Sequence, residues 1–182
     1  MFLVKDKSVD RESRILKFVE NDPALAIIMA TIHFEWTIQR AIISLSILPN
    51  KEVRRNLKMV YGIKKYKDCW KELISDVLFL PKLPTIVKEW NAVIKAFELR
   101  NQLVHGKTSC SIRFATPRVK SLIDAARLIR IFCENQSINL DSKLTSKKSR
   151  ITKEPYHNRT FAIGGISCSA DNSTFLENGI FE

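Results

Sequence analysis

The sequence has no apolar run long enough to act as a signal peptide or to cross a membrane. Charges interrupt the N-terminal segment MFLVKDKSVDRE, and the longest apolar region, PALAIIMATIHFEW, contains His33 and Glu35. A region of this kind is typical of a buried helix rather than a membrane span, and no secretory leader is indicated. We therefore expect no membrane partner and a cytoplasmic location.

Cysteine and glycine are also scarce. The four cysteines, Cys69, Cys110, Cys133 and Cys168, show no C-x-x-C pairing and no histidine at ligand spacing, which argues against a zinc site and against a disulfide framework. The 5 glycines form no phosphate-binding loop, and no carboxylate cluster suited to a divalent ion is present. We expect reduced structural thiols, no metal and no cofactor.

Positive charge, in contrast, is abundant. The 182 residues carry a net charge of +11, and nearly all of the surplus precedes residue 141, with 24 Lys and Arg against 14 Asp and Glu. A surplus of this size favours a polyanionic partner such as RNA, DNA or an anionic membrane surface. The alternative is a soluble protein that is basic without such a partner.

Helical periodicity runs through the first 140 residues. It predicts an all-α bundle with helices over 8–19, 23–46, 51–61, 65–79, 85–105 and 117–138. The second of these is apolar nearly all the way round, which indicates a central, buried helix. Residues 141–182 are polar and basic without a period, apart from a short FAIGGIS segment, and are predicted to form a linker and tail.

The segment FELRNQLVHG, residues 97–106, ends the predicted fifth helix in an unusual way. A helical wheel drawn from Ile86 places Val104 in the core stripe, with Arg100 on one flank and His105 on the other. Gly106 is expected to be the left-handed cap. The wheel puts Leu99 and Leu103 opposite the core, so we expect a second helix or a second subunit to cover them.

Arg100 and His105 suit phosphodiester cleavage. An arginine holds a phosphate by paired hydrogen bonds and stabilises the charge of the transition state. A histidine titrates near neutrality and can move the proton of a ribose 2′-hydroxyl or of the leaving oxygen. Two copies related by a two-fold axis would supply both an acid and a base. The alternative is structural, with Arg100 solvated and His105 bound to the last helical carbonyl groups.

The segment ELRNQLVHG resembles the signature of the HEPN superfamily, and the preceding helix IHFEWTIQRAIISL, with its central acidic residue, is similar to the family's long apolar helix. The resemblance covers about residues 20–140 and implies a HEPN-like bundle of about five to six helices. It implies that Arg100 and His105 are the catalytic pair and Asn101 their polar companion. It departs from the branch regulated by nucleotidylation of a tyrosine, because Lys107 stands at that position.

Active HEPN members are metal-independent RNA endonucleases that cleave through the 2′-hydroxyl and assemble their site across a homodimer. Many act as toxins or in phage defence. The resemblance therefore implies RNA as substrate, a homodimer with Leu99 and Leu103 at its contact, and an antitoxin or regulatory protein as a further partner. Other members are non-catalytic modules that bind RNA or protein, which is the alternative function. A DNA-binding helical regulator is a third, weaker alternative, since no recognition helix is evident.

Further residues have candidate roles. Glu35 on the central helix could orient Arg100, since a buried carboxylate needs a partner, and Gln39 and Arg40 are nearer alternatives. His33 is expected to be a core histidine with its polar atoms satisfied. The basic run over 51–67 is either a solvated face or a phosphate track. The RNA-binding residues that we predict are Lys64, Lys65, Lys67 and Lys107. Those expected in the core rather than on a base-stacking surface are Trp36, Trp70 and Trp90.

Overall fold

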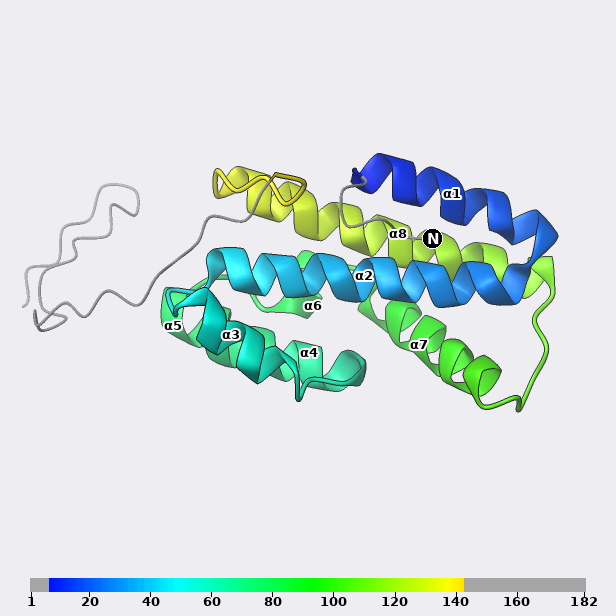
Figure 1. Cartoon of the computed structure of the whole chain (residues 1–182), viewed down its shortest axis with the longest axis horizontal. Coiled ribbons are helices and arrows are strands. Elements are labelled where there is room, and N and C mark those ends of the chain that lie inside the picture. Colours follow the sequence, from blue (N-terminus) through cyan, green and yellow to red (C-terminus); the bar gives the residue numbers. More distant parts are fainter. Residues whose placement is uncertain (1–6, 143–182) are drawn as a thin grey trace, which may run out of the picture. The chain divides into compact units, whose positions relative to one another are not determined.

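The computed structural model describes residues 7–142, and every regular element in this range is a helix, with no strand (Figure 1). The predicted all-α fold class is therefore confirmed for this part of the chain. The predicted tail lies outside it except for Asp141 and Ser142. In chain order the elements are α1 (Ser8–Asn21), α2 (Pro23–Leu45), α3 (Asn50–Leu57), α4 (Gly62–Trp70), a π-helical turn (Lys71–Ser75), α5 (Asp76–Leu78), α6 (Leu83–Ile86), α7 (Trp90–Val104) and α8 (Ile112–Asn135).

Helix α2 is the central element, and its bounds agree with the predicted helix over 23–46. The Asp22 carboxylate accepts a hydrogen bond from the backbone N–H of Leu25 at 2.9 Å, and Pro23 takes the first helical position. Both features are common at helix starts. Helices α1, α7 and α8 all pack against α2, and Figure 1 shows it between α1 and α8 on one side and α3, α4 and α7 on the other. Burial on several sides accounts for its nearly continuous apolar surface.

Helix α8 packs along α2. It begins at Ile112 rather than at Pro117, where the sequence predicted its start. Pro117 lies in the second turn and is exposed, so only the carbonyl group of Arg113 loses a helical partner there, and water can satisfy it. The predicted apolar stripe is confirmed, since all of its members are buried: Val119, Leu122, Ile123, Ala126 and Ile129.

The predicted helix over 51–61 ends early, at Leu57, the one over 65–79 begins earlier than predicted, and the one over 85–105 is divided. A helical run begins at Gly62, passes through the π-helical turn and ends at Phe79, whose φ is 54°. Gly62 begins α4 with a φ of 77°, a conformation that glycine adopts without strain. Val87 has an extended backbone and separates α6 from α7.

The buried side of α7 is formed by Val93, Ala96 and Phe97. Val104, predicted in the core stripe, is 54% exposed. Leu99 and Leu103, predicted to face away from the core, are half-buried and pack against it. The helical-wheel placement of these three residues is wrong, because the buried side of α7 is centred on Val93, Ala96 and Phe97, nearer to Leu103 than the wheel assumed, and Val104 lies in the last turn.

A buried polar cluster joins α1, α2 and α8. Oε1 of Glu12 lies 2.7 Å from Nη1 of Arg130, and its Oε2 lies 2.8 Å from Nη2 of Arg127. Nδ1 of His33 accepts a hydrogen bond from Nε of Arg11 at 3.2 Å, and Nε2 of His33 lies 3.5 Å from Oε1 of Glu12. Because an arginine only donates, a neutral His33 carries its proton on Nε2. His33 is 1% exposed, so the prediction of a core histidine is confirmed.

The cluster shifts the pKa of both Glu12 and His33. Burial raises the pKa of Glu12, but hydrogen bonds from His33 and Arg130 and the charge of Arg130 outweigh it and lower the pKa to about 2. Burial also lowers the pKa of His33, against the opposing effect of its hydrogen bond with Glu12. At neutral pH Glu12 is therefore ionised and His33 is neutral, which suits a structural role.

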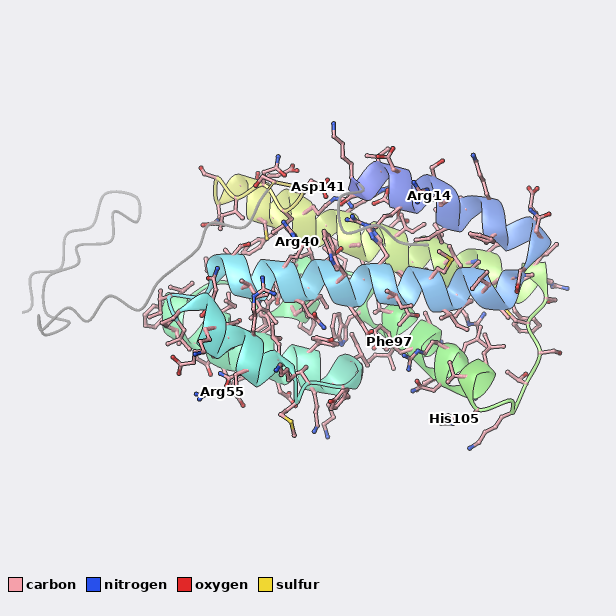
Figure 2. The ribbon with its side chains drawn as sticks, in the orientation of Figure 1. Arg14, Arg40, Arg55, Phe97, His105 and Asp141 are labelled. Atoms are coloured by element: carbon pink, nitrogen blue, oxygen red, sulfur yellow. The ribbon has the colours of Figure 1, made fainter. Side chains whose placement is uncertain are left out.

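The residues after α8 are tied to the bundle. The Asp141 carboxylate accepts a hydrogen bond from the Ser8 hydroxyl at 2.6 Å, and Arg40 donates to the backbone carbonyl groups of Leu140, at 2.7 Å, and Ser142. Figure 2 shows the Arg40 and Asp141 side chains on the same side of α2. The contacts of the bundle thus extend to the end of the described range.

The three tryptophans have different environments. Trp70 is fully buried, as predicted, and Trp90 is half-buried against the core. Trp36 is also only half-buried, and the guanidinium groups of Arg11 and Arg40 lie 3.9 Å and 4.7 Å from its ring centroid. The core placement of Trp36 is therefore wrong, and its ring is engaged in cation–π contacts.

Candidate functional site

Helix α7 ends in a Schellman motif. The N–H of Lys107 donates to the carbonyl of Gln102 at 2.9 Å, and the N–H of Gly106 donates to the carbonyl of Leu103 at 3.0 Å. Gly106 has a φ of 64°, the left-handed conformation that this motif requires. The predicted cap is confirmed, and it fixes His105 as the last residue before the chain turns away.

Arg100 lines a pocket of about 560 Å³ between α2, α3, α4 and α7. Nη1 of Arg100 donates to the Asn101 side chain at 3.0 Å, while its Nε is buried without a hydrogen-bond partner in the described part of the chain. The pocket is lined by Glu35, Gln39, Ile43, Arg54, Leu57, Lys58, Val60, Tyr61, Gly62, Tyr66 and Arg100.

Glu35 and Arg100 reach this pocket from opposite helices, α2 and α7. Burial raises the pKa of the Glu35 carboxyl, and the charge of Arg100 acts in the opposite direction. The carboxylate and the guanidinium thus interact electrostatically, although the described structure shows no ion pair between them. The nearer alternatives, Gln39 and Arg40, bond elsewhere: Gln39 donates to the Tyr66 hydroxyl at 2.6 Å, and Arg40 donates to the carbonyl groups after α8.

Tyr66 completes the polar side of the pocket. Burial raises the pKa of its hydroxyl, the hydrogen bond from Gln39 lowers it, and the charge of Glu35 raises it. The hydroxyl therefore keeps its proton at neutral pH. Because its oxygen accepts from Gln39, its own hydrogen remains available to a ligand.

His105 lies apart from this pocket. Its side chain is exposed and has no hydrogen bond or ion pair with any other described residue. Figure 2 shows His105 at the free end of α7, whereas Phe97 lies between α7 and the rest of the bundle. One chain therefore brings Arg100 and Glu35 to a common pocket but does not bring His105 into it.

The predicted RNA-binding lysines are on the surface. Lys64, Lys65 and Lys67 are exposed on α4, and Lys107 is exposed after α7. None of them lines the pocket, although α4 itself contributes Tyr66 to its wall. Asn101 is exposed beside Arg100.

Several pocket residues were not predicted from the sequence. Arg54 and Lys58 belong to the basic run over 51–67, but their four-residue spacing was the signal that both face the same space. Glu35, Gln39 and Ile43 have the same spacing along α2. Tyr61 and Tyr66 carried no comparable signal, because their place in the pocket depends on how α4 packs.

The described range contains neither a readily ionised cysteine nor a group of side chains placed to bind a metal ion. Burial raises the pKa of Cys69 to about 11 and that of Cys133 to about 12, and it also raises the pKa of Cys110, so these three thiols stay protonated at neutral pH. Between residues 7 and 142 no group of three or more His, Cys, Asp or Glu side chains is placed to hold a metal ion. Cys168 lies outside the described residues.

Comparisons of the chain with known protein families, curated proteins and solved structures find no match. In the described range, no helix combines the length and the apolar character needed to cross a membrane.

Proposed function

We propose that this chain is a HEPN-type, metal-independent endoribonuclease whose site is completed by a second copy of the chain, in a toxin or phage-defence role. The observation that carries the proposal is that neither side chain of the motif is held in a structural bond to the bundle. Arg100 faces an open, positively charged pocket, and the His105 imidazole is free at the helix end.

The chemistry assigns one step to each group. The ribose 2′-hydroxyl attacks phosphorus while an imidazole removes its proton, and the bond to the 5′-oxygen breaks as a second imidazole protonates that oxygen. The products are a 2′,3′-cyclic phosphate and a 5′-hydroxyl end. Arg100 stabilises the charge on the phosphoryl oxygens. Since one chain places a single His105 at this helix end, the second imidazole comes from the partner copy.

A non-catalytic role in binding RNA or a protein is the second candidate. It is favoured by the separation of His105 from the pocket that Arg100 lines within one chain. In that role Arg100 would hold an anionic group without proton transfer.

The test is incubation of the full chain with total RNA in the presence of EDTA, followed by mapping of the new ends. We expect cleavage that leaves cyclic or 3′-phosphate ends. R100A and H105A should each lower the rate by at least about a hundredfold, the scale of losing a charge-stabilising or proton-transfer group. The matched control is K95A, which removes an exposed cation from the same helix outside the pocket.

Two results would reject the proposal. One is activity that disappears with EDTA and returns with Mg²⁺. The other is activity that persists in both R100A and H105A. RNA binding without cleavage under all conditions would support the second candidate instead.

A further inference from the structure

We propose that the pocket between α2, α3, α4 and α7 binds one nucleotide unit with a guanine base, with the phosphate held by Arg54, Lys58 and Arg100. The inference deepens the proposed function. It rests on that function where the nucleotide unit belongs to a strand of RNA. A free nucleotide has the same chemistry and is the other source. The pocket volume of about 560 Å³ is within the range of small-molecule sites.

The charge of the pocket indicates an anionic ligand. Arg54 and Lys58 lie one helical turn apart at α3, and Arg100 comes from α7, while Glu35 is the only acidic residue that the described part of the chain places in the lining. Arg54 and Lys58 are exposed and Arg100 is half-buried, with a buried Nε that lacks a hydrogen-bond partner among the described residues. Cations from two elements that converge on one space suit a phosphate, which accepts several charge-assisted hydrogen bonds.

Other residues of the lining offer a pattern of hydrogen-bonding groups. Because Nε2 of Gln39 donates to Tyr66, Oε1 of Gln39 is left as an acceptor. The Glu35 carboxylate, one turn earlier on α2, provides two more acceptor oxygens, and the Tyr66 hydroxyl has its hydrogen available. These residues therefore present acceptors beside one donor.

Guanine is the base whose Watson–Crick edge fits this pattern. It carries two adjacent donors, N1–H and the N2 amino group, next to the acceptor O6. A carboxylate accepts the two donors together, and the Tyr66 hydroxyl can donate to O6. Adenine has an acceptor at N1, which would meet the Glu35 carboxylate unfavourably.

The remaining lining provides contacts for a flat ring. Ile43 and Leu57 are buried and Val60 is half-buried, so the pocket has an apolar part. Tyr61 is 72% exposed at the same pocket. A solvent-exposed aromatic ring at a nucleotide-sized pocket is suited to stacking on a base.

The experiment is calorimetric titration of the full chain with GMP, AMP, guanosine and inorganic phosphate. We expect GMP to bind at least about tenfold more tightly than AMP, the discrimination given by a good bidentate base contact. Guanosine should bind more weakly than GMP and with less dependence on salt, because it lacks the phosphate. This comparison uses only the wild-type chain and does not depend on any variant folding.

Two variants separate the base from the phosphate. E35Q should remove most of the preference for GMP over AMP, because it weakens the contact with the guanine donors and removes the repulsion between the carboxylate and N1 of adenine. R54A/K58A should weaken GMP and AMP equally and lower the dependence of log K on log salt. E98Q, an exposed change on α7 outside the pocket, is the matched control for E35Q.

The source of the nucleotide follows from a comparison of GMP with the trinucleotides ApGpA and ApApA. Tighter binding of ApGpA than of GMP assigns the pocket to a base within an RNA strand, whereas binding of GMP alone assigns it to a free nucleotide. The inference is overturned if GMP binds no better than inorganic phosphate, or if E35Q keeps the full preference for guanine.

Failure of the inference and failure of the proposed function give different results. Cleavage of RNA by a chain that does not bind GMP or ApGpA overturns the inference alone. Binding of GMP or ApGpA by a chain that never cleaves RNA overturns the nuclease proposal alone.

Discussion

Glu12 on α1 forms an ion pair with Arg130 on α8, with 2.7 Å between Oε1 and Nη1. The Glu12 side chain is only 4% exposed and also pairs with Arg127. The first and last helices of the described bundle are thus joined through one buried carboxylate, and its neutralisation would remove the charge that pairs with the guanidinium of Arg130, whose side chain is 13% exposed.

We expect E12Q to lower the free energy of unfolding by about 3–5 kcal/mol, the scale of breaking a buried pair by removing one partner. Urea denaturation at pH 7 measures the change. The control is E20Q, an exposed substitution on the same helix, which should change stability by less than about 0.5 kcal/mol. Equal effects of the two substitutions would show that the buried pair does not stabilise the fold.

Stability should fall as the pH is lowered. The pKa of His33 in the folded state lies below 6.5. As the pH drops below 6.5, the histidine of the unfolded chain therefore binds a proton first, and this favours unfolding. Glu12 adds a second loss between pH 4.5 and about 2, because its folded pKa is lowered and the unfolded chain binds the proton first. Urea midpoints measured from pH 8 to pH 3 should decrease in both ranges.

In E12Q the second loss should shrink, because the titrating group is gone. A pH profile of E12Q parallel to that of the wild type below pH 4.5 would contradict the assignment of that range to Glu12.

Replacement of Lys64, Lys65 and Lys67 by Gln should weaken RNA binding and flatten its salt dependence. The slope of log K against log salt is negative, and each lost phosphate contact reduces its magnitude by about 0.7 for a single strand. Filter binding at several salt concentrations gives the slope. The control replaces three exposed lysines on other helices, Lys17, Lys95 and Lys120, and an equal flattening in the control would show that α4 is not the RNA track.

The placement of α7 changes what lysine substitutions should do to the expected dimer. L99K/L103K should destabilise the chain itself by a few kcal/mol, because both leucines pack against the core. V104K should leave the fold stable, since Val104 is 54% exposed, and should weaken a dimer that forms at this helix end beside His105. Thermal denaturation measures the stability of each variant, and sedimentation velocity measures its oligomeric state. A stable, monomeric L99K/L103K variant would show that these leucines lie in the dimer interface.

Some helix ends can be predicted from local features of the sequence. Asp22 and Pro23 marked the start of α2, and Gly106 marked the end of α7, because each acts through its own backbone or first-turn contacts. The break at Val87 had no such signal: the segment TIVKEWNAVI contains neither Gly nor Pro. Tertiary packing imposes it, and packing likewise decides how far Leu99 is buried.

The candidate site was predictable only in part for a related reason. Arg100 and His105 stand together in one short segment, so a pattern in the sequence could indicate both. The pocket that Arg100 lines takes residues from four helices, and the spacing along one helix cannot show which helices meet. The positions of Arg54, Tyr61 and Tyr66 around Glu35 therefore required the packed structure.

The hydrogen bonds from Arg40 to the carbonyl groups of Leu140 and Ser142, and from Ser8 to Asp141, set a limit on how far the chain can be shortened. A fragment that stops after the last turn of α8 would lose the acceptors of Arg40 and the buried side chain of Leu140, which is 2% exposed. A fragment that ends before Leu140 should therefore be less stable than the full chain, while Glu12 still holds the first helix to α8 through Arg130.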